Sequence, residues 1–226
     1  MSAREDILGR VRRSLGRGPL DKTAAAPLEA RLAGHKTNLV PARAQGRDRA
    51  GLVDLFEAEV TAIKATVARV ASLDGVADAV ATYLASQNLP SEITTSPDPL
   101  LARVPWDKRP TLQRRTGVPR ASDMVGVSVA ASAIAETGTL LLESGPDNPS
   151  TLNFLPDTHV VVLPASRVVG PMEDAWKAVR ARHGDGRMSR TVNFITGPSR
   201  TADIEQKIEM GAHGPRRLHI LVIDDA

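Results

Sequence analysis

The chain has 226 residues, and 42% of them are hydrophobic, which is enough for one sizeable core. Its 29 basic and 26 acidic residues give a formal charge of +3, and three Phe, two Trp and one Tyr are the whole aromatic content. Neither nucleic acid nor an anionic membrane is therefore favoured as a partner. The absence of cysteine excludes disulfides, a thiolate nucleophile, and zinc sites or iron–sulfur clusters held by cysteines of this chain.

The beginning of the chain lacks the apolar region of a signal peptide. No apolar run approaches the roughly 20 residues that a membrane-spanning helix needs. We therefore expect a cytoplasmic protein without a membrane span.

The N-terminal region is predicted to form a helix followed by an arm. Ser2 and Glu5 form a capping-box pattern, and apolar residues then recur at helical spacing, which predicts a helix over 3–16. Residues 20–49 are rich in Ala, Arg, Pro and Gly without a sustained period, which indicates a linker or extended arm. We expect two regions: an N-terminal helix and arm over 1–50, and a single α/β domain over 51–226.

Helix and strand patterns alternate through the second region. Helices are expected over 52–63, after Asp74 as capping residue, and around 172–179. Strands are expected at 66–70, 92–95, 124–135, 139–143, 159–163, 192–195 and 218–223, with a hairpin turn at 136–138. Trp106, in the Pro-rich segment 97–119, is expected to fill the core. These patterns predict a largely parallel sheet.

Several familiar sites are excluded by inspection. The sequence has no phosphate-binding loop and no complete dinucleotide-binding fingerprint. Gly126-Val127-Ser128 continues with Ala130, so the nucleophile elbow is incomplete and Ser128 is expected to be a strand residue. None of the five histidines pairs at the i, i+4 spacing of helical metal ligands, so no metal site is predicted.

Three segments are predicted to place polar groups at carboxyl ends of strands, where open α/β sheets bind ligands. The first runs over 135–139. A carboxylate such as Glu136, at a tight turn among apolar residues, suits a general acid, a general base or a nucleophile, with Thr137, Gly138 and Thr139 as ligand-binding neighbours. The alternative is that Glu136 caps nearby amides while Gly138 allows a positive φ.

The second segment runs over 195–205. Gly197 is expected to turn the chain and Ser199 to cap a new helix, whose amides, with Arg200, would favour a phosphate or carboxylate. Thr196 and Thr201 complete this group of candidate ligand-binding residues. The alternative is an ordinary strand-to-helix turn.

The third segment is Gly211-Ala212-His213-Gly214-Pro215, before the final strand. Small neighbours let other backbone approach the imidazole, so His213 is a candidate acid–base group or ligand donor. The alternative is a structural histidine. We expect the three segments to converge into one polar crevice.

Together these segments resemble the lactate utilisation protein C family. The resemblance rests on residues 126–128, 133–139, 155–156, 196–205 and 211–215. It implies the fold of the glucosamine-6-phosphate isomerase, ribose-5-phosphate isomerase and CoA-transferase group, a three-layer sandwich around a mostly parallel sheet. The chain departs from this family at 148–154, where relatives often have an arginine before Leu-Pro and this chain has none.

The resemblance implies a role in a three-component system that oxidises L-lactate to pyruvate, in which partner proteins hold the iron–sulfur clusters. The missing cysteines fit that division, so we expect no cofactor on this chain. It would bind a small anionic ligand or order its partners, with the N-terminal helix and arm as docking element.

Two alternatives stay open. One is a stand-alone enzyme acting on a phosphorylated or CoA-linked small molecule, with Glu136 as base or nucleophile, as CoA-transferase-type enzymes use a glutamate at a comparable turn. The other is a non-catalytic assembly scaffold. Whether the chain catalyses a reaction is left undecided by the sequence.

Overall fold

The structure is a computed structural model that describes residues 2–16, 18, 20–37, 39–184, 186–204 and 207–225, apart from the side chains of 202–208 and 225. The chain divides into two compact units, Met1–Leu39 and Val40–Ala226. None of the helices in the described part is long and apolar enough to cross a membrane.

The first unit holds two helices, α1 (Ala3–Ser14) and α2 (Lys22–Gly34). The predicted capping box begins α1, because the Ser2 hydroxyl accepts from the Glu5 amide and the Glu5 carboxylate accepts from the Ser2 amide. The prediction of an extended arm over 20–49 is wrong for residues Lys22–Gly34, which form α2. That helix starts at Asp21, whose carboxylate accepts from the Ala24 amide at 2.7 Å. Its Ala-rich sequence favours helix by intrinsic propensity without an apolar period.

The second unit contains four further α-helices and twelve strands among its described residues. The helices are α3 (Arg49–Ala62), α4 (Val76–Ser86), α5 (Pro99–Ala102) and α6 (Met172–His183). The strands are β1 (Thr66–Ser72), β2 (Glu92–Thr95), β3 (Gln113–Thr116), β4 (Val125–Val129), β5 (Ser132–Ile134), β6 (Thr139–Glu143), β7 (Thr158–Pro164), β8 (Val168–Val169), β9 (Val192–Ile195), β10 (Arg200–Ile204), β11 (Lys207–Met210) and β12 (Arg217–Asp225).

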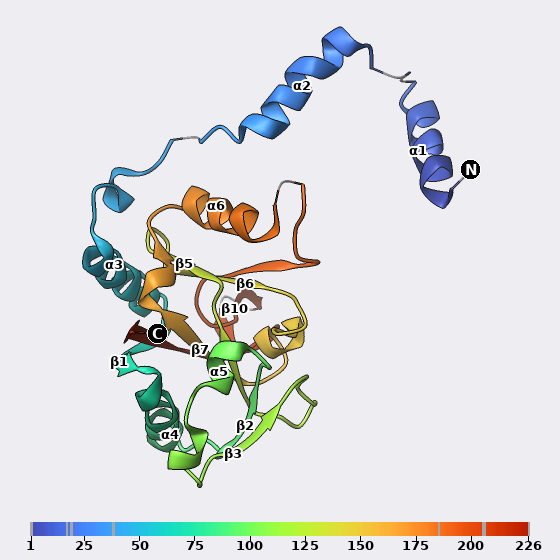
Figure 1. Cartoon of the computed structure of the whole chain (residues 1–226). Coiled ribbons are helices and arrows are strands. Elements are labelled where there is room, and N and C mark those ends of the chain that lie inside the picture. The colour runs from blue at the N-terminus through green and yellow to red at the C-terminus, as the bar shows by residue number, and fades with distance from the viewer. Residues whose placement is uncertain are drawn as a thin grey trace. The chain divides into compact units, whose positions relative to one another are not determined.

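A six-stranded sheet in the order β1-β12-β7-β4-β2-β3 forms the centre of this unit, and every neighbouring pair in it is parallel (Figure 1). This confirms the predicted α/β fold around a largely parallel sheet. From β2 the chain runs outward to the edge strand β3, then returns past β2 to β4 and continues the other way through β7 and β12. The direction of winding therefore reverses between β2 and β4.

A second sheet has the order β8-β5-β6-β9. The hairpin predicted around residues 136–138 is confirmed, because β5 and β6 pair antiparallel. The strand predicted at 192–195 is also present, as β9, but it pairs antiparallel with β6 in this second sheet. The sequence pattern did not separate the two sheets.

The helix predicted after Ser199 is wrong. Residues after Ser199 form β10, which pairs antiparallel with β11 through Arg200 opposite Met210 and Thr201 opposite Glu209. The main-chain amides of this segment therefore belong to a hairpin, and no helix N-terminus is available for an anion here. Asp74 is likewise not a helix cap: its carboxylate lies 3.4 Å from Lys108 Nζ, and α4 begins without a side-chain cap.

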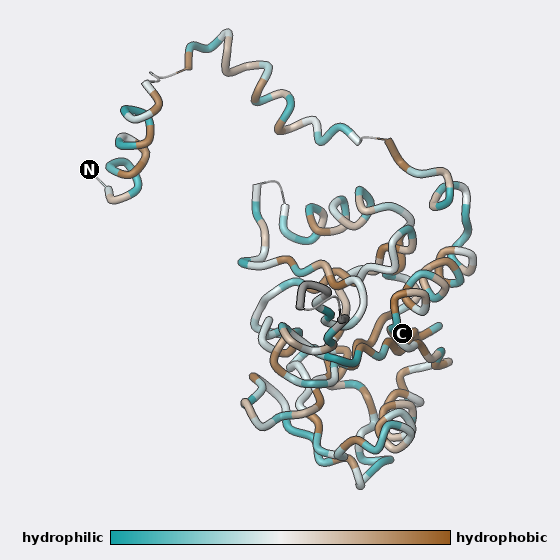
Figure 2. Tube along the Cα trace, turned by 180° about the vertical axis from the view of Figure 1, so that it is seen from behind, coloured by the Kyte–Doolittle hydropathy of each residue, from teal (hydrophilic) through white to brown (hydrophobic). Residues whose placement is uncertain are grey.

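Alternate residues of β7 supply the two faces of the central sheet. Val160 and Val162 pack in a cluster with α4, whereas Val161 and Leu163 pack with α3 and with strands of the second sheet. Figure 2 shows the apolar stretches along the strands in brown. α6 covers the other face of the second sheet with Ala175 and Val179 packed in a cluster with β5 and β6. Trp106 is buried in the core as predicted, and its Nε1 donates to the Leu101 carbonyl at 2.8 Å.

Candidate functional site

Three cavities of the second unit carry polar side chains in their walls. The histidine pocket, of about 200 Å³, is lined by Asn153, Phe154, His159, residues 194–199 and 213–215, and Leu218. The arginine pocket, of about 380 Å³, is lined by Asp98, Val129, Ala131, residues 143–148, Arg167, Arg182, His183 and Ser189. The edge pocket, of about 460 Å³, is lined by Pro90, residues 92–94, 113–115 and 122–124.

Two of the three predicted segments meet at the histidine pocket. The Ser199 amide donates to the Pro215 carbonyl at 2.8 Å, and the Gly211 amide donates to the Ser199 carbonyl at 2.9 Å. The Ser199 hydroxyl accepts from the His213 amide at 3.3 Å. Thr196, Gly197, Ser199 and His213 therefore lie around one hollow. Arg200 and Thr201 continue into β10 and are outside its lining.

The position of this pocket corrects one expectation. Residues 211–215 precede β12, and Leu218 of β12 is paired with His159 near the start of β7. The pocket thus lies at the amino ends of these central strands, whereas the sequence analysis placed the third segment at a carboxyl end. The 196–199 loop does follow the carboxyl end of a strand, β9, in the second sheet.

Two fully buried polar side chains form part of the wall. His159 and Asn153 are each only 1% exposed. The Ser128 hydroxyl lies 2.7 Å from His159 Nε2, but His159 Nδ1 and both polar atoms of the Asn153 amide have no hydrogen-bond partner within the described part of the chain. Buried polar groups are nearly always hydrogen-bonded, so these three atoms lack the partners that such groups usually have.

The charge state of His159 follows from its burial. Burial in the core lowers the pKa of His159 to about 4, so its imidazole is neutral at pH 7. When the Ser128 hydroxyl donates to Nε2, Nδ1 carries the ring hydrogen and is an unused donor. The Asn153 amide adds a donor and an acceptor, while Phe154 and Leu218 supply apolar wall. This arrangement suits a small ligand with both polar and apolar surface.

Sequence reasoning missed His159 and Asn153. His159 falls in the strand expected at 159–163 and Asn153 in the segment 148–154, and neither is among the predicted site residues. The available signal was a single imidazole in an otherwise apolar strand, because such a side chain requires a polar partner when both faces of its strand are covered.

The first predicted segment lies beside the histidine pocket without lining it. Hydroxyl groups connect the two: Thr137 Oγ1 is 2.7 Å from Thr139 Oγ1, which is 2.8 Å from Thr196 Oγ1. Gly138 has φ +61°, and a Cβ on it would lie 2.8 Å from the Val60 amide nitrogen. Gly138 therefore has a conformational and packing role, as the alternative interpretation of this turn expects.

Glu136 lines none of the three cavities. It is half-exposed; its amide donates to the Gly170 carbonyl at 3.2 Å and its carbonyl accepts from Arg43. The Arg43 guanidinium also pairs with Glu59 at 2.9 Å. Among the described residues, the Glu136 carboxylate has no ion-pair partner of its own.

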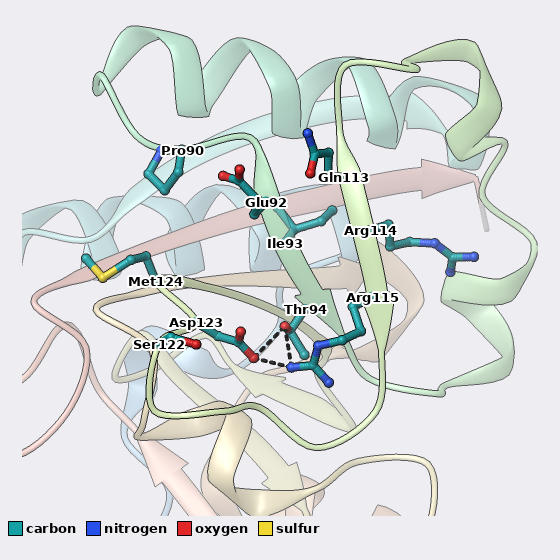
Figure 3. A pocket seen from close by; sticks show the side chains of 10 residues that line it. All are labelled: Pro90, Glu92, Ile93, Thr94, Gln113, Arg114, Arg115, Ser122, Asp123 and Met124. Carbon is teal, nitrogen blue, oxygen red and sulfur yellow. Dashed lines mark hydrogen bonds and ion pairs between the residues drawn. The ribbon is translucent and has the colours of Figure 1, made fainter.

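The edge pocket is the largest of the three, but its charged groups at the Arg115 end satisfy one another (Figure 3). Asp123 pairs with Arg115, and its carboxylate accepts from the Thr94 hydroxyl at 2.8 Å and the Arg120 amide at 2.7 Å. Burial alone would raise the pKa of Asp123, but these hydrogen bonds and the Arg115 charge outweigh it and lower the pKa. Figure 3 shows Arg114 pointing away from this group. We interpret the network as structural.

Metal ligands are not clustered: within the described ranges, no group of three or more His, Asp or Glu side chains could hold an ion.

Comparisons with known proteins agree on one family. The sequence profile of the LUD domain matches residues 120–223, which include all three predicted segments. Lactate utilization protein C of Shouchella clausii is 34% identical over 120 residues, 53% of this chain and 52% of that protein. The protein of the same name from Anoxybacillus flavithermus is 38% identical over 101 residues, 45% of this chain and 44% of that protein. The chain thus matches about half the length of these relatives.

Among solved structures, a DUF162 family protein from Deinococcus radiodurans has the same fold. It superimposes with a TM-score of 0.60 at 22% sequence identity, over 79% of this chain and 99% of that one. The match to the LUD domain and the relatives named lactate utilization protein C confirm the resemblance to the lactate utilisation protein C family seen in the sequence, and this solved structure shows the same fold.

Proposed function

We propose that this chain is a component of an L-lactate utilisation system, and that its histidine pocket binds a small anionic ligand of that system. The relatives named lactate utilization protein C support the first part. The second part depends on one observation: His159 and Asn153 are fully buried beside the pocket, yet three of their polar atoms have no partner among the described residues.

L-Lactate and pyruvate fit this pocket chemically. Each has a carboxylate that accepts hydrogen bonds. The Asn153 amide nitrogen and the Nδ1–H of the neutral His159 imidazole would be donors to it. Each also has a methyl group, for which Phe154 or Leu218 would be an apolar contact. The Ser199 hydroxyl lies at the same hollow and would complete the polar side.

We also propose that this chain carries no iron–sulfur cluster and works with partner proteins that do. The absence of cysteine supports this division. The N-terminal unit supports a docking role, because neither α1 nor α2 buries a residue among those described. On α1, Ile7 is 60% exposed and Val11 is 49% exposed. A helix with an uncovered apolar stripe gains stability when a partner covers it.

Growth on L-lactate tests the proposed role. In a strain from which the gene has been deleted, a Gly214→Leu variant should fail to restore growth. A Cβ on Gly214 would lie 3.5 Å from the Ser199 side chain and 3.9 Å from Phe154, so a leucine fills the pocket without removing any polar group. Ala85→Leu adds the same bulk at an exposed position of α4 and should restore growth.

A ligand panel on the purified chain tests binding directly. L-Lactate or pyruvate at about 100 times its Kd should stabilise the fold by about 2.7 kcal/mol, and Gly214→Leu should abolish the stabilisation by pyruvate. If the deletion strain still oxidises lactate, the proposed role is wrong. If phosphorylated compounds or CoA esters stabilise the fold and L-lactate and pyruvate do not, the ligand belongs to the alternative enzyme class.

A further inference from the structure

The arginine pocket lies at the place where the central sheet reverses its winding. Asp98 follows β2, Val129 ends β4, and Arg167 follows β7, so the pocket is at the carboxyl ends of three central strands. β2 and β4 are neighbours, and the chain leaves them in opposite directions. Open α/β sheets bind ligands in the crevice at such a switch point. This pocket is thus at the opposite end of the sheet from the histidine pocket.

Arg167 is a half-buried cation in this pocket. Its Nη1 donates to the Ala130 carbonyl at 2.7 Å, which fixes the guanidinium to the end of β4. Within the described ranges, no carboxylate lies within 4 Å of it. Burial lowers the pKa of Arg167; the negative charge of Asp98 opposes this effect, and the positive charge of Arg182 adds to it. A fixed guanidinium with no carboxylate of the described residues in direct contact is suited to a carboxylate ligand.

Asn148 supplies a second unsatisfied group. It is 8% exposed, and its Nδ2 donates to the Glu143 carbonyl at 3.0 Å. Its Oδ1 is buried and has no partner among the described residues. An amide oxygen only accepts, so the missing partner at this atom is a hydrogen-bond donor.

The remaining charges restrict the ligand. Glu143 is satisfied by Arg182 Nε and the Ser189 hydroxyl, both at 2.9 Å, and by His183. Asp98 caps α5 by accepting from the Leu100 amide at 2.7 Å. With Asp147, the lining has three carboxylates and two guanidinium groups. A doubly charged phosphate would meet more repulsion there than a singly charged carboxylate would.

From these observations we infer that the arginine pocket binds a small monocarboxylate with a hydrogen-bond donor next to the carboxylate. The carboxylate pairs with Arg167, and a neighbouring hydroxyl or ammonium group donates to Asn148 Oδ1. The site is separate from the histidine pocket and does not depend on the proposed role in lactate utilisation.

Binding of glycolate, glycine, acetate and inorganic phosphate to the full chain tests this site. The readouts are the NMR signals of the Arg167 Nε–H and the Asn148 side-chain amide. Glycolate or glycine should shift both signals with saturation and bind more tightly than acetate, which lacks the donor, and phosphate should be weakest. Comparing glycolate with glycine shows whether the donor is a hydroxyl or an ammonium group.

Variants locate the bound acid. Arg167→Gln should weaken binding about tenfold or more, because it removes a charge-assisted hydrogen bond. Gly145→Leu adds bulk at the lining of the pocket and keeps every charge, and a Cβ there meets no atom within 4 Å, so this variant remains informative if Arg167→Gln does not fold. Arg120→Gln removes an exposed charge and should change nothing.

Two results would overturn the site: no saturable shift at Arg167 or Asn148 in the unaltered chain, or unchanged affinity in Gly145→Leu. Loss of binding in Gly214→Leu but not in Gly145→Leu would place the acid in the histidine pocket instead. Unchanged binding in Gly214→Leu keeps the two sites distinct.

Discussion

Ser128 on β4 and His159 on the neighbouring β7 form a buried pair, with the serine Oγ 2.7 Å from the histidine Nε2. The pair fixes the imidazole at the wall of the histidine pocket, where its Nδ1 has no partner among the described residues. A second buried histidine, His219, is held differently: its ring stacks on Tyr83 at 3.8 Å, and its Nδ1 lies 2.8 Å from Thr66 Oγ1.

These two histidines predict loss of stability in acid. Burial lowers the pKa of both His159 and His219 to about 4, against 6.5 for an ordinary histidine. Below pH 6.5 the unfolded chain binds protons that the folded chain does not, so the free energy of unfolding falls as the pH drops from about 6.5 towards 4. The loss should reach about 3 kcal/mol for each histidine.

Urea unfolding measured between pH 7.5 and pH 4.5 checks this prediction. His159→Gln should reduce the pH dependence, while replacement of the exposed His35 should not change it. The explanation would be wrong if stability stayed constant over that range, or if His159→Gln kept the full pH dependence.

Replacing Glu143 should loosen the connection between β6 and α6. Its side chain is 10% exposed and accepts from Arg182 and Ser189, with His183 alongside. Burial raises the pKa of Glu143, but the hydrogen bonds from these three side chains outweigh burial and lower it. Glu143→Gln should cost about 2 kcal/mol, because it leaves a partly buried arginine without its counter-ion. Chemical denaturation of Glu143→Gln and of the exposed control Asp147→Asn would measure the difference.

Gly138→Ala should destabilise the turn between β5 and β6. The substitution forces a residue with a side chain to adopt φ +61° and brings its Cβ to within 2.8 Å of the Val60 amide nitrogen on α3. We expect a loss of about 2 kcal/mol or more. The matched substitution Gly145→Ala meets nothing within 4 Å and should be nearly neutral. Equal melting temperatures for the two variants would contradict this role of Gly138.

Glu136→Gln should leave ligand binding in the histidine pocket unchanged. The Glu136 carboxylate lines none of the three cavities, whereas the Ser199 hydroxyl lies at the pocket. Ser199→Ala should weaken binding of L-lactate or pyruvate, because it removes one polar contact and the acceptor of the His213 amide. Isothermal titration calorimetry on both variants measures the two effects. Loss of binding in Glu136→Gln alone would show that Glu136 takes part in binding the ligand.

The features predicted correctly from the sequence are those with a local signal. The capping box at Ser2 and the apolar run of β7 each depend on neighbouring residues, so the pattern alone identifies them. The hairpin of β5 and β6 joins strands separated by a short turn. The α2 helix was missed because its stability comes from propensity and from the Asp21 cap rather than from an apolar period.

The candidate sites were predicted less completely, because they depend on contacts between distant residues. The loops at 196–199 and 211–215 were singled out for their glycines and polar groups, and they do meet. That β10 pairs with β11 instead of forming a helix was not visible, since strand pairing is set by the partner strand. The arginine pocket joins Asp98, Asn148 and Arg167, which no local pattern connects.

The central claim is that His159 and Asn153 receive their missing polar partner from a ligand in the histidine pocket. Titrating the full chain with L-lactate and with pyruvate, while following the NMR signals of the His159 ring nitrogens and the Asn153 side-chain amide, tests it most directly. We predict saturable shifts at both residues that disappear in Gly214→Leu and persist in Ala85→Leu. Signals that stay unchanged by either acid, or that shift equally in Gly214→Leu, would contradict it.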